Sequence, residues 1–270
     1  MRRESTQFYI PIVLAIVVAA GLTYYWVQIN KSDAPPEPVS APVTVEPVAE
    51  DSKLPIHPYP RVASPEGPGG ELIALPPLDQ SDEYLKLELA EVLGSRAVAN
   101  MLADADLIAK IVATVDNLPR SHVAGRIRPV AGLAGAFDVE VISATEFTIS
   151  PQSYDRYTVL VDMVAGADLK ELTGVYGRFY PLFQQAYEDL GYPNAYFNDR
   201  LVAVIDHLLT APEVPAPLKV VRPHVLYEYA DMDLESLSSG QKLLIRMGDE
   251  NAAKIKKALS ECRRLIANYD

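Results

Sequence analysis

The sequence predicts a mainly α-helical protein: a single compact helical domain with one small β-hairpin, preceded by a transmembrane helix and a disordered Pro-rich linker. Three observations lead to this class. Residues 8–29 contain no charged side chain, and Pro is dense in residues 33–78. From residue 79 onward, apolar side chains recur at the three- and four-residue spacing of amphipathic helices. The 270 residues are enough for one sizeable core beside these N-terminal segments.

The first element is a membrane anchor. Residues 8–29 form an uncharged run of 22 residues, "FYIPIVLAIVVAAGLTYYWVQI". As a helix with a rise of about 1.5 Å per residue, this run would span about 33 Å, enough to cross the hydrocarbon core of a bilayer. The two arginines in residues 1–7 place that end in the cytoplasm, because positively charged flanks stay inside. In a bacterium with a cell envelope, the expected location is the inner membrane, crossed once, with the C-terminal domain in the periplasm.

A cleaved signal peptide is the alternative interpretation of this run. Residues 18–20 are small, as a signal peptidase requires. The apolar run continues past them to Trp26, further than a usual signal core extends. This length favours the uncleaved anchor.

Residues 30–78 form the linker. Twelve of the 46 residues from 33 to 78 are Pro, interleaved with Glu, Val, Ala and Ser. Proline removes backbone donors and favours extended polyproline geometry, while the acidic side chains repel one another. Such a stretch buries too little apolar surface to fold by itself, so we expect a disordered spacer.

Charge and cysteine content restrict the partners. The chain carries a formal net charge of −12. Phosphate binding needs a basic face, so this composition argues against a nucleic-acid partner. The single cysteine, Cys262, has no internal disulfide partner and lies on an apolar helix stripe, which is typical of a small core residue.

The domain over residues 79–270 is predicted to consist mostly of helices. Periodic apolar spacing and end signals define helices over 81–94, 104–118, 151–166, 169–190, 195–209, 238–248 and 249–269.

Other local signals refine this outline. Alternating apolar residues in "FDVEVISATEFTIS" predict a hairpin that turns near 143–145. Asp168 and Glu171 predict a capping box for the longest helix, and Pro181 inside that helix predicts a kink. A Pro-punctuated connection follows the 195–209 helix, with a short strand at 224–229.

The stretch "GYPNAYFNDRLVAVIDHLL" (191–209) gathers polar and aromatic side chains at the start of a helix. Arg200 and His207 are seven residues apart and share one helix face. With side chains of the 169–190 helix, they would line a polar cleft between the two helices. The candidate ligand- or partner-binding residues are Arg178, Gln185, Tyr196, Asn198, Asp199, Arg200 and His207.

A purely structural interpretation accounts for the same residues, and we favour it. Asn194 or Asn198 would cap the helix, and Asp199 in the first turn would complement the helix dipole. His207 falls near the C-terminal end, where a cation is favourable.

The sequence carries no motif that fixes a reaction. The four histidines, at positions 57, 122, 207 and 224, lack the spacing of metal ligands, so neither a metal nor another cofactor is expected. GxSxG and phosphate-binding Gly loops do not occur. No catalytic residue is therefore assigned, and a non-enzymatic role is favoured over an enzyme.

Three long stretches together resemble a known family. "IVATVDNLPR", "YPLFQQAYEDLGYPNAYFNDRLVAVIDHLL" and "PHVLYEYADMDLESLSSGQKLLIRMGDENAAKIKKAL" resemble the bacterial family called domain of unknown function 3014, over most of residues 79–265. The N-terminal anchor and Pro-rich spacer are similar to that family's usual layout. The resemblance implies a membrane-tethered envelope protein of proteobacteria and brings no catalytic residues.

Two functional hypotheses follow. In the first, the domain is a binding or scaffolding module of the cell envelope, anchored in the lipid bilayer by residues 8–29. The spacer would let it reach a protein partner in the periplasm, because tethering raises the effective concentration at a second site. In the second, the domain is a hydrolase or small-ligand binder that uses the polar cleft.

Overall fold

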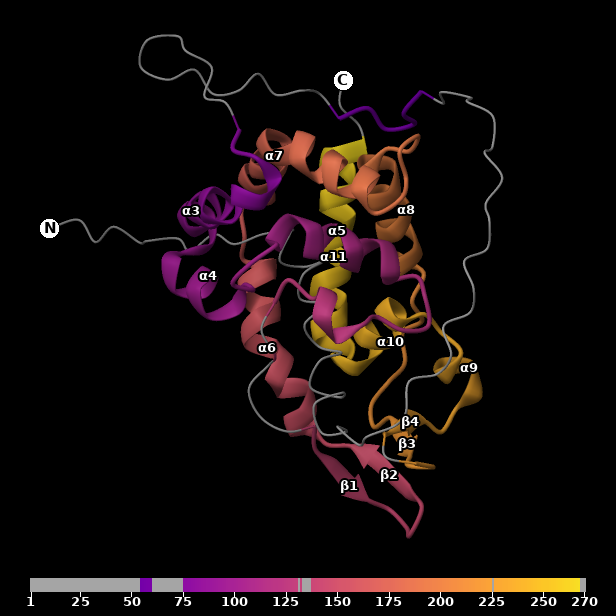
Figure 1. Ribbon diagram of the computed structural model, residues 1–270. Coiled ribbons are helices and arrows are strands. Elements are labelled where there is room, and N and C mark those ends of the chain that lie inside the picture. Colours follow the sequence, from indigo (N-terminus) through magenta and orange to yellow (C-terminus); the bar gives the residue numbers. More distant parts are fainter. Residues whose placement is uncertain (1–53, 60–74, 131, 133–136, 225, 268–270) are drawn as a thin grey trace, which may run out of the picture.

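The computed structural model describes residues 54–59, 75–130, 132, 137–224 and 226–267 (Figure 1). The membrane anchor expected at 8–29 lies outside these residues, as does most of the 30–78 spacer. Both therefore stay predictions. Among the described residues, no helix combines the length and the apolar character needed to cross a bilayer.

The described part of the chain is mainly helical, as predicted. Two helices, α4 and α9, were not foreseen. The α-helices are α3 (Asp82–Leu93), α4 (Ser95–Met101), α5 (Leu107–Asn117), α6 (Pro151–Ala165), α7 (Leu169–Asp189), α8 (Phe197–Leu209), α9 (Met232–Glu235), α10 (Ser239–Arg246) and α11 (Asp249–Ala267). Two short 3-10 helices are η1 (Leu78–Gln80) and η2 (Gly125–Ile127).

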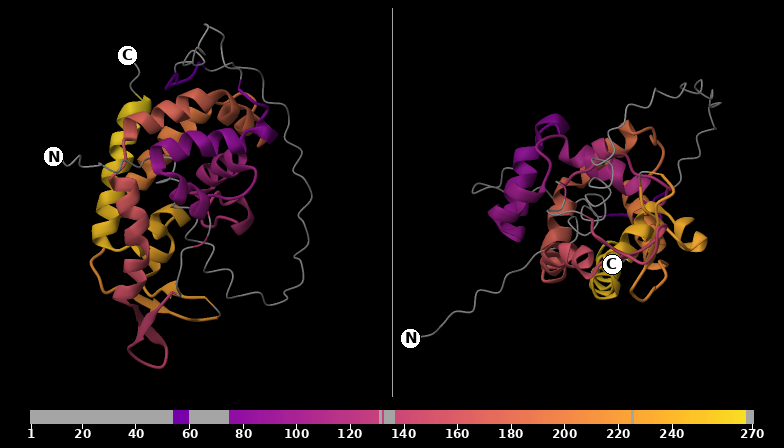
Figure 2. Two further views of the ribbon diagram at one scale, coloured as in Figure 1. Left: turned by 90° about the vertical axis from the view of Figure 1, so that its left-hand side faces the viewer. Right: turned by 90° about the horizontal axis from the view of Figure 1, so that it is seen from below.

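Helix α11 runs along one side of the molecule (Figure 2), with α6 beside one half and α8 beside the other (Figure 1). Helix α7 also packs on α11, and α5 crosses both α7 and α8 (Figure 2). The apolar stripes of these helices meet in one large core, in which Val112, Val204 and Cys262 are fully buried. Burial also raises the pKa of the Cys262 thiol, so this side chain is an inert core residue.

The start of α5 differs from the prediction. The helix begins at Leu107 rather than at Asp104. Its first N–H groups are capped by a distant side chain: Asp82 accepts from the N–H of Asp106 and of Leu107, each at 2.7 Å. Local sequence could not reveal this cap because Asp82 belongs to α3.

Helix α7 begins at the N-cap that the sequence predicts, and the Asp168 half of the predicted capping box is present. The Asp168 carboxylate accepts from the N–H of Lys170 at 2.9 Å and of Glu171 at 3.1 Å. The helix then continues through Pro181 to Asp189 without a break.

The β-structure includes the predicted hairpin and a strand within the predicted 224–229 segment, and it also has a strand that was not predicted. Strands β1 (Val139–Val141) and β2 (Glu146–Ile149) form that hairpin, and β3 (Lys219–Val221) and β4 (Glu228–Tyr229) extend it into an antiparallel sheet in the order β1-β2-β3-β4. Strand β3 was missed because three residues between prolines carry too little alternation to signal a strand. The sheet has its own small core, formed by Ile149, Leu218, Val220, Tyr229 and Ile245.

Candidate functional site

One end of the helical core is covered by residues 54–59 (Leu-Pro-Ile-His-Pro-Tyr), which we call the strap. The strap crosses the start of α8 and the C-terminal end of α11 (Figure 1). It belongs to the stretch that the sequence assigns to the spacer. The surface beneath it, which we call the groove, consists of Thr173, Tyr176, Tyr180, Tyr196, Asn198 and Asp199.

The groove binds the strap through its main chain. The two oxygens of Asp199 accept the N–H of Ile56 at 3.0 Å and the N–H of His57 at 2.7 Å. The Nδ2 of Asn198 donates to the carbonyl oxygen of His57 at 2.9 Å. It also donates to the carbonyl oxygen of Ile266 at 3.0 Å. Asn198 is fully buried and therefore joins the strap, α8 and the end of α11 in one hydrogen-bond network.

Tyr59 is the side-chain anchor of the strap. It is only 7% exposed, and its hydroxyl donates to the carbonyl oxygen of Thr173 at 2.7 Å. Its ring lies edge-on to Tyr176, with 5.0 Å between centroids, and 5.4 Å from the ring of Tyr180. These are favourable aromatic distances, and the buried hydroxyl has its partner.

Aromatic side chains fill the contact between α7 and α8, where the sequence interpretation placed a polar cleft. Phe183 stacks on Phe197 with 5.7 Å between centroids, and Tyr176 meets both rings edge-on. The Tyr176 hydroxyl donates to Oδ1 of Asn198 at 3.3 Å. Burial raises the pKa of Tyr176 well above its ordinary value and that of Tyr180 to about 12, so both hydroxyls stay protonated at neutral pH.

The remaining candidate residues point to separate partners. Arg178 pairs with Glu88 of α3. Arg200 donates to the carboxylate of Asp116 at 2.9 Å and to its backbone carbonyl at 2.7 Å, which ties α8 to α5. Gln185 is exposed on the far side of α7, beside η1 and the start of α5. The structure thus brings Tyr196, Asn198 and Asp199 together at the strap and separates the others from them.

His207 contacts Ser238, with Nε2 and Oγ 2.8 Å apart. A Ser–His contact is the starting arrangement of many hydrolases. Here, however, Ser238 closes the capping box of α10: its Oγ accepts from the N–H of Gln241 at 3.2 Å. Ser238 is also buried, so the contact joins α8 to α10.

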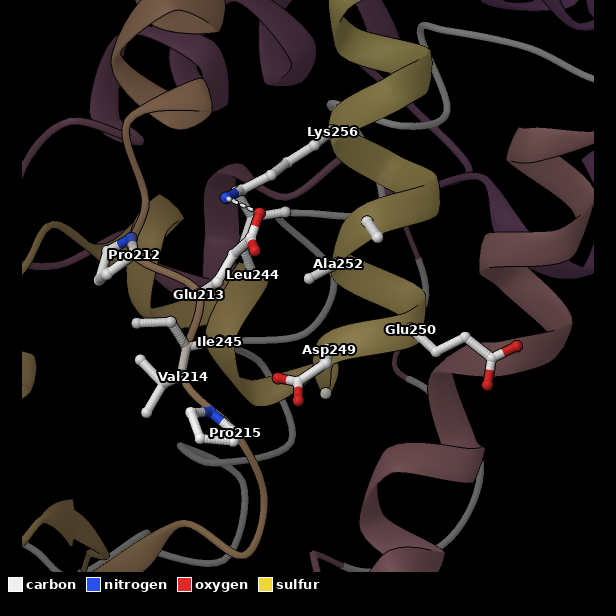
Figure 3. A pocket seen from close by; sticks show the side chains of 12 residues that line it. Pro212, Glu213, Val214, Pro215, Leu244, Ile245, Asp249, Glu250, Ala252 and Lys256 are labelled. Carbon is white, nitrogen blue, oxygen red and sulfur yellow. Dashed lines mark ion pairs between the residues drawn. The ribbon is translucent and has the colours of Figure 1, made fainter.

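A second depression lies at the opposite end of α11 (Figure 3). Its volume is about 590 Å³, with an apolar floor that includes Leu244 and Ile245. Lys256 reaches across it to the carbonyl oxygen of Ala211 at 2.7 Å and to Glu213 at 3.7 Å. The Glu213 side chain is 88% exposed, so its charge is solvated. We take the groove as the candidate site because it already holds an extended segment through polar and aromatic contacts.

The groove can hold an extended chain, and nothing in its chemistry points to a reaction. Its polar groups are one carboxylate, one carboxamide, the main-chain carbonyl of Thr173 and tyrosine hydroxyls. Within the part of the chain that the structure describes, no group of three or more His, Cys, Asp or Glu side chains is placed to hold a metal ion.

Sequence reasoning found half of the groove. Tyr196, Asn198 and Asp199 were candidates, but Thr173, Tyr176 and Tyr180 were not, and neither was Tyr59 of the strap. A signal for the strap exists: Tyr59 is the only Phe, Tyr or Trp between residues 30 and 78, and the strap itself has no acidic residue. An aromatic residue in an otherwise polar spacer is typical of a segment that binds a folded surface.

The fold and the groove define a small helical domain that holds an extended segment across one end of its core. The chain belongs to the family described as "Protein of unknown function (DUF3014)", which it matches over residues 107–263. This confirms the resemblance found in the sequence, and the matched region includes Asn198 and Asp199 but not the strap. No curated protein and no solved structure matches the chain.

Proposed function

We propose that this protein is a non-enzymatic binding module of the bacterial cell envelope, tethered to the inner membrane by residues 8–29 with its domain in the periplasm. The observation that carries the binding role is the grip of Asn198 and Asp199 on three main-chain groups of an extended segment. Main-chain hydrogen bonds supply affinity in several modes of peptide recognition. The net charge of −12 favours a protein partner over a nucleic acid.

The other polar candidates support binding rather than catalysis. Arg178, Arg200 and His207 each contact a residue of another helix or cap. These contacts give each side chain a structural role that accounts for its position.

The periplasmic location of the domain is tested by labelling one engineered cysteine. Val159 lies on α6 and is 79% exposed, whereas the native Cys262 is fully buried and gives little background. In cells with a permeabilised outer membrane, a membrane-impermeant maleimide should label Val159→Cys and leave the wild-type chain unlabelled. Labelling of Val159→Cys only after the inner membrane is lysed would place the domain in the cytoplasm and contradict the proposal.

The binding role is tested by photo-crosslinking in the native host. A photoreactive amino acid at Tyr196, on the wall of the groove, should give adducts with another envelope protein. The same amino acid at Val159, on the exposed face of α6, is the matched control and should give none. Equal adducts from both positions, or none from Tyr196, would count against a binding groove.

A hydrolase is the second candidate, and the contact between His207 and Ser238 is the observation that favours it. The Ser238→Ala variant distinguishes a structural role of this contact from a catalytic one. If the contact is structural, this variant loses about 1 kcal/mol of stability, as is typical for a lost N-cap, and keeps its cellular function. Loss of function in a folded Ser238→Ala protein would instead support the hydrolase.

A further inference from the structure

The hydrogen bonds of the groove impose a pattern on whatever chain it holds. They use the N–H groups of Ile56 and His57 and the carbonyl oxygen of His57. Proline has no N–H, so these two positions must be other residues. The positions on either side, Pro55 and Pro58, donate no N–H in the strap and are free to be proline, which favours the extended form.

Side-chain exposure alternates along the strap. Leu54 and Ile56 are 86% and 78% exposed, whereas Tyr59 is 7% exposed. Pro55 and His57 are intermediate and face the groove side. In an extended chain with this alternation, the side chains that face the groove contribute most to recognition. Pro58 is exposed overall, but, like Pro55, it lines the depression beside the strap. The residue at position 59 therefore carries most of the side-chain specificity, and position 56 carries almost none.

The groove is wider than the strap. A depression of about 320 Å³ remains beside it, lined by Pro55, Pro58, Tyr59, Tyr180, Pro181, Gln184 and Tyr196. Tyrosine rings next to a proline-bearing chain are the surfaces that recognise extended Pro-rich segments in other peptide-binding domains.

The strap is a replaceable occupant. It has six residues, and most of its polar contacts come from Asn198, Asp199 and the Thr173 carbonyl. Fifteen residues, 60–74, separate it from the rest of the described domain. A ligand tied to its site over such a distance has an effective concentration on the order of millimolar, so a partner segment displaces it only where its additional contacts outweigh this advantage.

We infer that the groove takes, in trans, an extended segment of a partner protein with the pattern Pro-x-x-Pro-aromatic, in which neither x is proline. The strap is then a built-in competitor that occupies the groove until such a segment displaces it. This inference rests on the proposed binding function and names the class of its ligand.

The test uses a fluorescent peptide with the sequence of residues 52–61, SKLPIHPYPR, and the full-length chain in detergent. Ile56→Pro in the chain removes one N–H that Asp199 accepts, and the Ile56 side chain is exposed, so the core is untouched. We expect this variant to bind the peptide at least tenfold more tightly than the wild-type chain, because its own strap competes less. Adding Asp199→Ala to the same variant should abolish that binding.

Two altered peptides test the pattern on the Ile56→Pro chain. Alanine at the Tyr59 position should weaken binding at least tenfold, because it removes the buried anchor. Alanine at the Ile56 position should change binding less than twofold, because that side chain faces solvent.

The inference is overturned if the Ile56→Pro chain binds the peptide no better than the wild type, or if the two alanine peptides lose affinity equally. Absence of binding to either chain also overturns it. If the peptide does not bind while photo-crosslinking from Tyr196 still captures a partner, the ligand class is wrong and the binding function stands. If neither experiment gives a signal, both proposals fail.

Discussion

The two ends of α11 leave backbone groups without helical partners, and they are satisfied in different ways. At the C-terminal end, the carbonyl oxygen of Ile266 accepts from Asn198 at 3.0 Å, and that of Ala267 lies 3.3 Å from Nδ1 of His57. At the N-terminal end, Asp249 lies in the first turn, where a carboxylate complements the helix dipole.

This difference sets where the fold is sensitive to substitution. The C-terminal end depends on residues from α8 and from the strap, which is about two hundred positions away in the sequence. The N-terminal end is tied to α6 by the buried Asn251, whose Nδ2 donates to the carbonyl oxygen of Tyr154 at 3.2 Å, and it borders the depression (Figure 3). Substitutions at the groove should therefore destabilise the protein more than substitutions at the depression.

The largest loss is expected from Asn198→Ala. This change leaves the Ile266 and His57 carbonyls and the Tyr176 hydroxyl without their buried partner. We expect a loss of about 3 kcal/mol in the free energy of unfolding, measured by urea denaturation. Asn117→Ala is the matched control, because Asn117 donates only to Ala113 within its own helix and should cost less than about 1 kcal/mol. Equal losses of unfolding free energy in the two variants would show that the network around Asn198 adds nothing to stability.

Tyr59→Ala should have the next largest effect. It removes a buried ring and a hydrogen bond to Thr173, at a cost of about 2 kcal/mol. Limited proteolysis should cut the strap faster in this variant, while Tyr59→Phe should lose about 1 kcal/mol and resist the protease better. Wild-type cleavage rates in Tyr59→Ala would mean that the ring does not hold the strap.

Asp199→Ala removes the acceptor of two strap N–H groups. Because Asp199 is partly exposed and water replaces its bonds in part, we expect a loss of about 1.5 kcal/mol. Hydrogen exchange at the amides of Ile56 and His57 should become fast while exchange in α8 stays slow. Protected strap amides in this variant would contradict the assigned bonds.

Alkaline pH should lower the unfolding free energy through Tyr180, which lies in the groove. Burial raises the pKa of Tyr180 from 10.0 to about 12, so the folded protein holds this proton more tightly than the unfolded chain. The stabilisation of the folded state that results from this raised pKa is complete below pH 10 and is lost as the pH rises towards 12. Tyr180→Phe should flatten the fall in unfolding free energy above pH 10, and Tyr84→Phe, at an exposed tyrosine, should leave it unchanged.

The smallest effect is expected at the other end of α11. Glu213→Gln removes the ion pair with Lys256, whose two charged atoms are 3.7 Å apart at an exposed carboxylate. Exposed pairs contribute little, so the unfolding free energy should change by at most about 0.5 kcal/mol. A loss as large as that of Asp199→Ala would remove the contrast between the two ends.

Much of the helical outline was predictable, because its signals are local. The apolar spacing in α7, α8 and α11 and the Asp168 cap each depend on residues a few positions apart. The features that the sequence did not predict share one cause: they depend on contacts between distant segments. Strand β3 pairs with β2 across about seventy residues, and the Asp82 cap reaches α5 from another helix. Neither contact produces a periodic pattern of residues in its own segment.

The candidate site shows the same division. The unusual density of polar and aromatic side chains at 191–209 identified Tyr196, Asn198 and Asp199, but their partners lie elsewhere in the chain. Helical spacing alone grouped Arg200 with His207, yet each side chain found its partner on a different helix.

The sequence by itself determined the helical class, the family and the helix that carries Asn198 and Asp199, because short-range spacing and long motifs encode them. Only the tertiary structure decided that the contact between α7 and α8 is aromatic and that a proline-bearing strap closes the end of α11. The physical reason is that a buried carboxamide or carboxylate must find donors and acceptors. Which segment supplies them depends on the packing of the whole chain.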